Sequence, residues 1–261
     1  MDKERNSIEF KVYGRHALFS DPITRVGGEK FSYQVPTYQA LVGIVESIYW
    51  KPTFIWIIDA IRVMKKIQTE SKGIKTLQMN GVYPSLRNPA KKEAAIFDLS
   101  YYTYLRDVEY QVLAHFEWNK NYPELAADRN EHKHHNIAKR LVIKGGRRDI
   151  FLGTRECQGY VEPCVFNDGE GFYDNYGELE FGTMFHGFDY PSYTGREEFA
   201  KRLWRDAKMK DGVIKFPHPE SETLLRQDIR PLDVRRFAAS QNFSFLENDP
   251  SLVNLPKEEG A

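Results

Sequence analysis

Cysteine is nearly absent from this 261-residue sequence, which contains only Cys157 and Cys164. Two cysteines are too few to hold a chain of this length together as a disulfide scaffold. Their spacing is also not that of a zinc knuckle. We therefore expect two reduced thiols in a cytoplasmic protein.

Long hydrophobic runs are missing as well. The longest apolar stretch, Phe54–Ile58, is far too short to cross a bilayer. Residues 1–7 are charged and contain no apolar signal-peptide region. We expect neither a secretory route nor a membrane partner.

The chain also lacks net charge, because 37 Lys and Arg residues balance 37 Asp and Glu residues. Any binding of nucleic acid must therefore depend on a local basic surface. Several catalytic signatures are missing too: there is no Walker A sequence, no GxGxxG between a strand and a helix, and no GxSxG elbow. The carboxylates are scattered, which disfavours a two-metal nuclease. We expect no metal site and no cofactor.

What the sequence does contain is aromatic residues, at 14%, which favour strands. Thr37 is a plausible helix N-cap, and Gly145-Gly146 is a plausible helix stop. The expected elements are a strand at 8–13, a helix at 38–50, strands at 53–67 and 101–118, a helix at 128–144, and extended chain at 150–152 and 157–161. This order predicts an α+β fold with a ferredoxin-like βαββαβ domain.

Two regions do not follow this pattern. Periodicity is lost between residues 69 and 100, which predicts a mobile excursion between two strands. Beyond residue 162, regularly spaced glycines separate short aromatic runs and predict a small antiparallel β-sheet domain. Within it, Phe199–Trp204 is interpreted as a short helix, and the tail from Leu246 as irregular and acidic. The expected domains are thus 1–162 and 163–261.

The strongest local signal is a basic strip from Arg129 to Arg148, in which seven cations face one acid, Glu131. The strip is a candidate phosphate-binding surface, although a run of charge is often only a solvated helix face. Its candidate RNA-binding residues are Lys139, Arg140, Lys144, Arg147 and Arg148. Arg147 and Arg148 are favoured because Gly145-Gly146 would let RNA approach the backbone. The alternative is that both arginines pair with carboxylates such as Asp149.

The same strip holds His132, Lys133, His134 and His135. Their spacing does not suit metal binding, because helical metal ligands are usually four residues apart. Solvent-facing structural histidines and general acid–base catalysis both remain open.

Topology adds a further argument. In a ferredoxin-like fold the two helices run antiparallel on one face of the sheet, so the end of the first lies beside the start of the second. Tyr49, Lys133 and His134 should then meet, and they could cleave RNA without metal by moving protons and stabilising the phosphate. Taken alone, Tyr49 could equally be an amphipathic residue at a helix end.

Seven segments of the chain are similar to one known family: Ala17–Pro22, Gly27–Lys30, Ser32–Leu41, Glu46–Thr53, Asp128–Glu131, Gly145–Gly153 and Arg155–Val161. Through these segments the chain resembles the RAMP-superfamily endoribonucleases of type I-C CRISPR systems. The resemblance extends from about residue 8 to beyond Pro191. It is weakest at residues 77–99 and after Pro217.

The resemblance implies a ferredoxin-like, RRM-type domain followed by a small β-sheet domain. It further implies metal-independent cleavage of CRISPR precursor RNA at the 3′ base of the repeat stem-loop, leaving a 2′,3′-cyclic phosphate and a 5′-hydroxyl. The family's catalytic Tyr corresponds to Tyr49, and its Lys-His pair to Lys133-His134. His132 and His135 flank this pair, which leaves open which histidine titrates.

The resemblance also implies partners. They are the precursor RNA, the 5′ handle of the mature crRNA, and the backbone and large subunits of the type I-C Cascade, which together contact target DNA. Two alternatives stay open from the sequence: a Cascade subunit that only binds the handle, and an unrelated ferredoxin-like RNA-binding protein.

Overall fold

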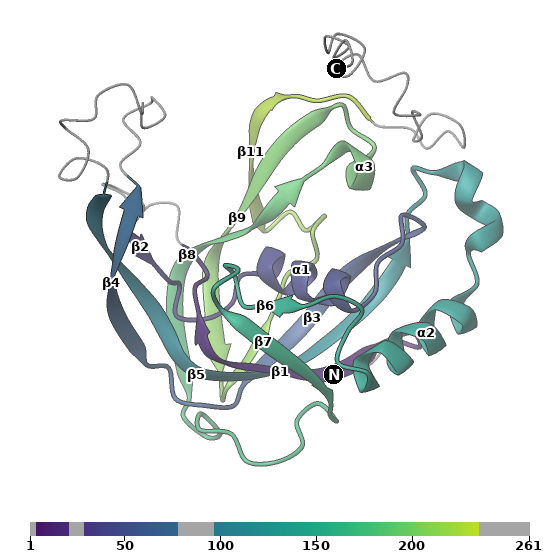
Figure 1. Ribbon diagram of the computed structural model, residues 1–261. Coiled ribbons are helices and arrows are strands. Elements are labelled where there is room, and N and C mark those ends of the chain that lie inside the picture. The colour runs from purple at the N-terminus through teal and green to yellow at the C-terminus, as the bar shows by residue number, and fades with distance from the viewer. Residues whose placement is uncertain (1–3, 21–28, 78–96, 235–261) are drawn as a thin grey trace, which may run out of the picture.

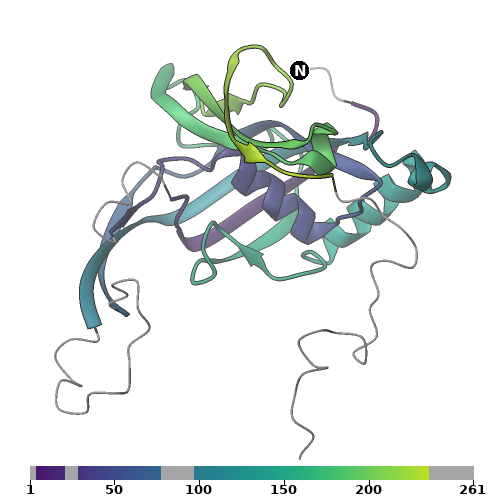
Figure 2. The same ribbon diagram turned by 90° about the horizontal axis from the view of Figure 1, so that it is seen from above.

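The structure is a computed structural model that describes residues 4–20, 29–77 and 97–234 of the chain. Its central element is the long strand β5 (Phe97–Trp118). The inner part of β5 pairs antiparallel with β1 (Ile8–Ala17) on one side and β3 (Phe54–Val63) on the other. The outer part pairs with β4 (Thr69–Leu77). In Figures 1 and 2 this outer pair projects away from the helices α1 and α2.

One sheet runs through the described residues in the order β11-β9-β10-β3-β5-β1-β7-β6, with β2, β4 and β8 paired off this path. The pairings are antiparallel except that of β2 with β5. The remaining strands are β2 (Lys30–Phe31), β6 (Ile150–Phe151), β7 (Gln158–Pro163), β8 (Glu178–Asp189), β9 (Glu198–Lys210), β10 (Val213–Lys215) and β11 (Leu224–Pro231). The expected α+β class, rich in antiparallel sheet, is confirmed.

Two helices cover part of this sheet, and the sequence explains where each begins. The Thr37 hydroxyl accepts the Ala40 N–H and caps α1 (Tyr38–Ile48), as expected. Asn130 caps α2 (Glu131–Ile143) by accepting the Lys133 N–H. The second helix therefore starts three residues later than expected, because residues 123–128 form a 3₁₀ helix, η4 (Pro123–Asp128). No helix in the described ranges is long and apolar enough to span a bilayer.

The hydrophobic core lies between α1, α2 and the inner strands. Six residues of α1 are buried at helical spacing: Tyr38, Leu41, Val42, Ile44, Val45 and Ile48. Alternate residues of β1, such as Phe10 and Val12, are also buried. The aromatic side chains Phe54, Trp56 and Phe116 fill the core where β3 and β5 meet the start of α2. Packing here fixes the position of both helix ends.

The expected irregular excursion at 69–100 is wrong for residues 69–77 and 97–100, which are strand. Residues 78–96 lie outside the described part. The side chains of β4 contact neighbouring strands through polar groups, so β4 shows little hydrophobic alternation. Ser71 Oγ lies 2.9 Å from Thr103 Oγ1, and Glu70 lies 3.0 Å from His16. Main-chain pairing leaves no periodic trace in a sequence.

The C-terminal region is β-rich, as expected, but the short helix at Phe199–Trp204 is wrong, since this segment lies in β9. Pairing with β8 and β11 on its two sides overrides the local preference. A short helix occurs instead at α3 (Pro191–Thr194). Through β10 these strands hydrogen-bond to β3, so the sheet continues across the expected domain boundary. The tail from Leu246 lies outside the described residues.

Two glycines make a matched test of this packing. Gly153 has φ +96°, and a Cβ there would lie 2.0 Å from the Leu18 carbonyl oxygen. Gly43 lies inside α1, where a Cβ would meet nothing within 4 Å. We expect Gly153→Ala to lower the free energy of unfolding by more than about 2 kcal/mol. Gly43→Ala should raise it by roughly 0.5–1 kcal/mol. Urea denaturation of both variants measures the difference, and equal effects would contradict this account.

Candidate active site

Tyr49 and His134 meet at the junction of the two helices. Tyr49 is the C-cap residue of α1, and His134 lies in the first turn of α2. The Tyr49 hydroxyl is 2.7 Å from His134 Nδ1. The convergence expected from topology is therefore present, and it brings together side chains 85 residues apart in the chain.

The other ring nitrogen of His134 fixes the proton positions. His134 Nε2 is 2.7 Å from the main-chain oxygen of Asp128. Because a carbonyl oxygen can only accept, Nε2 must carry a proton. In the neutral ring Nδ1 is then the acceptor, so the Tyr49 hydroxyl donates to it. The geometry of the main chain thus selects one tautomer of His134.

The pair is enclosed by aromatic side chains. The His134 ring packs against Phe54 at 5.3 Å between centroids, Trp118 at 5.9 Å and Phe116 at 6.4 Å. His134 has 0% exposed surface and Tyr49 has 4%. His134 is therefore not a solvent-facing histidine, and it cannot touch a phosphate directly in this arrangement.

Asp128 links this pair to Lys133. Its Oδ1 accepts from Lys133 Nζ at 2.5 Å, and its Oδ2 accepts from Thr53 Oγ1 at 3.0 Å. Oδ2 also lies 3.5 Å from His134 Nε2. Lys133 is half exposed, unlike the two other members of the expected trio. Asp128 thus connects Lys133 to His134, and His134 in turn contacts Tyr49.

Burial and charge set the ionisation of the site. The hydrogen bond from Lys133, helped by that from Thr53, holds the pKa of the Asp128 carboxyl below its usual value. Asp128 is therefore ionised at neutral pH. Burial raises the pKa of Tyr49 to about 12, and the Asp128 charge adds to the rise. Tyr49 is thus a neutral hydroxyl at neutral pH and can pass on a proton only through a partner.

The flanking histidines have other contacts. His132 Nε2 lies 3.3 Å from Arg5 Nη2 on the surface. His135 donates from Nε2 to the main-chain oxygen of Ser7 at 2.8 Å. Among the histidines of this run only His134 contacts Tyr49 within the described residues.

The five candidate RNA-binding cations of the basic strip are exposed, but they do not all line the same cavity. Arg147 and Arg148 line a cavity of about 660 Å³ together with Tyr13 and Tyr160. Lys139 lines a different cavity, beside the N-terminal residues. Arg140 and Lys144 are exposed on and just after α2. None of these five cations forms an ion pair within the described residues, so Asp149 does not neutralise the two arginines there.

Gly145 and Gly146 have a conformational role. Their φ angles are +84° and +105°, which a residue with a Cβ rarely adopts. This turn lets the main-chain N–H groups of Arg147 and Arg148 both donate to the Ser47 carbonyl at the end of α1. The glycines therefore hold the arginines near the active-site end of that helix.

Sequence reasoning missed Asp128 and Thr53 as members of the site. The sequence pattern predicts Asp128 as the start of a helix and not as a site residue, although a carboxylate five residues before Lys133 is a usable signal. Within the described residues no group of three or more His, Cys, Asp or Glu side chains forms a possible metal site. Cys157 and Cys164 are both free thiols.

Comparison with known proteins identifies the family. A family model described as "CRISPR-associated protein (Cas_Cas5)" matches residues 7–217. A protein of Mannheimia succiniciproducens named CRISPR pre-crRNA endoribonuclease Cas5d is 30% identical over 242 residues, covering 85% of this chain and 99% of that protein. A protein of the same name from Thermus thermophilus is 26% identical, covering 84% and 95%.

Solved structures are consistent with this family match. A functionally uncharacterized protein from Streptococcus mutans is 36% identical with a TM-score of 0.64, covering 84% of this chain and 96% of that one. The crystal structure of a CRISPR-associated protein is 34% identical with a TM-score of 0.62 and the same coverage. The chain belongs to the CRISPR-associated Cas5 family, in its Cas5d branch. The resemblance to type I-C endoribonucleases seen in the sequence is thereby confirmed.

The trio can be tested by single-turnover cleavage of a CRISPR repeat RNA. We expect His134→Ala and Lys133→Ala each to lower the rate by roughly 10²-fold, the scale of missing proton transfer or charge stabilisation. His132→Ala is the matched control, because His132 lies on the surface away from Tyr49. Melting curves check that each variant folds. Wild-type rates in both site variants would refute the assignment.

The arginine pair can be tested by the salt dependence of RNA affinity. Replacing Arg147 and Arg148 with Ala should lower the slope of log affinity against log salt by roughly 0.7–0.9 for each phosphate that the variant no longer binds. The control double variant, Arg205→Ala with Arg230→Ala, removes the same charge from exposed positions on β9 and β11. It should reduce the slope less than the Arg147 and Arg148 double variant does. If the two double variants behave alike, the turn after α2 does not contact RNA.

Proposed function

We propose that this protein is an endoribonuclease that cuts CRISPR precursor RNA at the 3′ base of the repeat stem-loop without a metal ion. The observation that carries the proposal is the hydrogen bond between Tyr49 and a His134 whose tautomer is fixed by Asp128. Two curated relatives are named CRISPR pre-crRNA endoribonucleases. The RNA supplies its own nucleophile, the 2′-hydroxyl beside the scissile phosphate.

Deprotonation of the 2′-hydroxyl passes through Tyr49. As the 2′-oxygen attacks phosphorus, its proton moves to Tyr49 Oη while the phenolic proton moves to His134 Nδ1. Tyr49 ends as a neutral hydroxyl, which its high pKa requires. His134 becomes an imidazolium, and the Asp128 carboxylate 3.5 Å from Nε2 stabilises it. A buried base can in this way act on RNA that it does not touch.

Lys133 acts on the phosphate. Its ammonium is half exposed and is tied to the pair through Asp128, and it can stabilise the negative charge that grows on the phosphate oxygens. It can also give a proton to the departing 5′-oxygen. The products are a 2′,3′-cyclic phosphate and a 5′-hydroxyl. Asp128 is a positioning residue here, because it holds Lys133 and orients His134.

Tyr49 is 4% exposed, so access of RNA requires side chains at the mouth of the site to move. Arg147 is close enough to Tyr49 to oppose the rise in its pKa. A phosphate held by Arg147 and Arg148 would therefore lie near the reacting group. Arg grips phosphate bidentately, which suits this positioning task.

After cleavage the protein keeps hold of the 5′ handle of the mature crRNA. It does so as a cytoplasmic subunit of the type I-C Cascade, beside the backbone and large subunits, and it meets target DNA only through that assembly. Support for retention comes from five exposed cations of the strip that lie outside the catalytic trio and form no ion pair within the described residues: Lys139, Arg140, Lys144, Arg147 and Arg148.

The finer fold assignment belongs to the same proposal. Residues 1–162 would form a ferredoxin-like, RRM-type domain, and residues 163–261 a small β-sheet domain. The strand order β7-β1-β5-β3 supports the first part, because it is the order of a split βαβ motif. The pairing of β8, β9 and β11 supports the second.

A subunit that binds the handle without cutting it is the second candidate. The complete burial of His134 favours it, since a buried histidine can also be a satisfied core residue. The fixed tautomer and the half-exposed Lys133 favour catalysis. Incubation of the protein with repeat RNA, followed by end-group analysis of the products, separates the two candidates.

Two substrates test the chemistry. We expect cleavage of the all-ribose repeat to persist in excess EDTA, because side chains and the RNA supply every proton and nucleophile. An RNA with 2′-deoxyribose on the 5′ side of the cut should bind and stay whole. Cleavage of that deoxy substrate would contradict attack by the 2′-hydroxyl.

A further inference from the structure

A second cavity, of about 310 Å³, lies apart from the catalytic trio. It is bounded by α1, β3, the end of β8 and the loop at 217–224. Its size falls within the range of small-molecule sites. Tyr38 lines its apolar side and stacks on the buried His186 at 4.1 Å between ring centroids. Burial lowers the pKa of His186 to about 3, so this side carries no charge at neutral pH.

One wall is a fixed set of charges. Asp189, 4% exposed, accepts from both Arg202 and Arg226, the latter at 2.8 Å. Arg226 also contacts Glu198 at 2.5 Å. Because these charges neutralise one another, the wall is rigid and does not call for a counter-ion.

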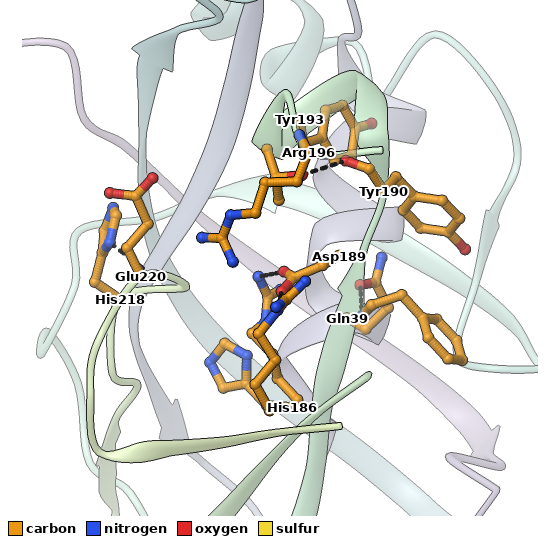
Figure 3. A network of polar contacts seen from close by, with 12 residues as sticks. Gln39, His186, Asp189, Tyr190, Tyr193, Arg196, His218 and Glu220 are labelled. Carbon is orange, nitrogen blue, oxygen red and sulfur yellow. Dashed lines mark hydrogen bonds and ion pairs between the residues drawn. The ribbon is translucent and has the colours of Figure 1, made fainter. Parts of the chain in front are cut away.

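Other charged groups at the cavity have no such partner. Arg196, Glu220 and Glu222 line it and form no ion pair within the described residues. Figure 3 shows the Arg196 guanidinium lying between Asp189 and the loop that carries His218 and Glu220. The cavity therefore offers guanidinium donors and carboxylate acceptors to the same occupant.

These groups limit the chemistry of the occupant. A phosphate is disfavoured, because the four acids at the cavity (Glu117, Asp189, Glu220 and Glu222) outnumber its three arginines. A neutral, flat molecule with both acceptors and donors on its edges fits instead. Guanine has this pattern: its O6 and N7 accept from Arg, and its N1–H and N2–H donate to a carboxylate.

The cavity connects with the active-site region. Tyr193 lines it and also lines a neighbouring cavity of about 370 Å³ that contains Trp50 and Arg148. Trp50 follows Tyr49 directly, is 37% exposed and lines this neighbouring cavity. Single-stranded nucleic acid is commonly bound by such a series of aromatic and cationic side chains.

We propose that this cavity binds one unpaired guanine of the RNA, extruded from the strand next to the cut. The inference rests on the proposed function, since it takes the RNA from the trio past Trp50 and Tyr193. Arg196 reads O6 and N7, and Glu220 accepts from N1–H and N2–H. The pocket would thus give the enzyme a sequence requirement outside the stem.

The test is a coupling measurement with a repeat RNA made uncleavable by one 2′-deoxyribose at the cut. Each unpaired nucleotide is made abasic in turn, and affinity is measured for wild type, Arg196→Ala and the control Arg205→Ala. We expect one guanine position whose removal weakens wild-type binding roughly tenfold. The same removal should cost Arg196→Ala no more than about twofold, which is the signature of coupling. Arg205→Ala should behave as wild type.

Base analogues at that position show which protein residue contacts each edge of the guanine. 7-Deazaguanine, which lacks N7, should couple to Arg196→Ala, and inosine, which lacks the N2 amine, should couple to Glu220→Gln. Arg196 is exposed and forms no ion pair in the described structure, so its replacement should leave the melting temperature unchanged.

Several results would overturn the proposal. They are the absence of any coupled position, coupling at a base other than guanine, and an Arg196→Ala effect on association with other proteins but not on RNA affinity. The all-ribose RNA keeps this apart from the proposed function. If the all-ribose RNA is cleaved but no position couples to Arg196, only the guanine-binding proposal is wrong. If a guanine couples to Arg196 but the RNA is not cleaved, only the proposed nuclease function is wrong. If the protein does not bind the RNA, both proposals are wrong.

Discussion

The hydrogen bond between Tyr49 and His134 depends on nearly everything else in the fold. It exists because the end of α1 and the start of α2 are held against the same part of the sheet, where β3 and β5 supply Phe54, Phe116 and Trp118. Those rings exclude water from His134, so its two nitrogens must find partners in the protein. The carbonyl of Asp128 and the hydroxyl of Tyr49 are these partners, and together they set the direction in which a proton can move.

Burial of His134 has a consequence for the proposed mechanism. A histidine on the surface could touch the phosphate, but a fully buried one would have to act through the tyrosine. In the proposed mechanism the two tasks are separated: the buried pair would move the proton, and the half-exposed Lys133 would stabilise the charge of the RNA phosphate. Asp128 connects the two because its carboxylate binds Lys133 while its main chain orients His134.

The strands after residue 163 extend the sheet of the first part. Through β10 they hydrogen-bond to β3, and their hairpins form one side of the cavity that contains Arg196. A β-rich C-terminal region therefore does more than enlarge the protein. It builds a second polar site within reach of the first, which would let one chain both cut RNA and read a base beside the cut.

The sequence by itself determined the elements whose causes are local. Thr37 caps α1, alternation marks β1, and Gly145-Gly146 ends α2, because capping, burial and positive φ each leave a residue-level trace. It also placed Tyr49 near His134, through the antiparallel order of two helices. Only the tertiary structure decided that β4 is a strand, that 199–204 is not a helix, and that Asp128 joins Lys133 to His134. Main-chain pairing between distant segments and contacts across a core depend on three-dimensional proximity, and no periodicity in one chain encodes them.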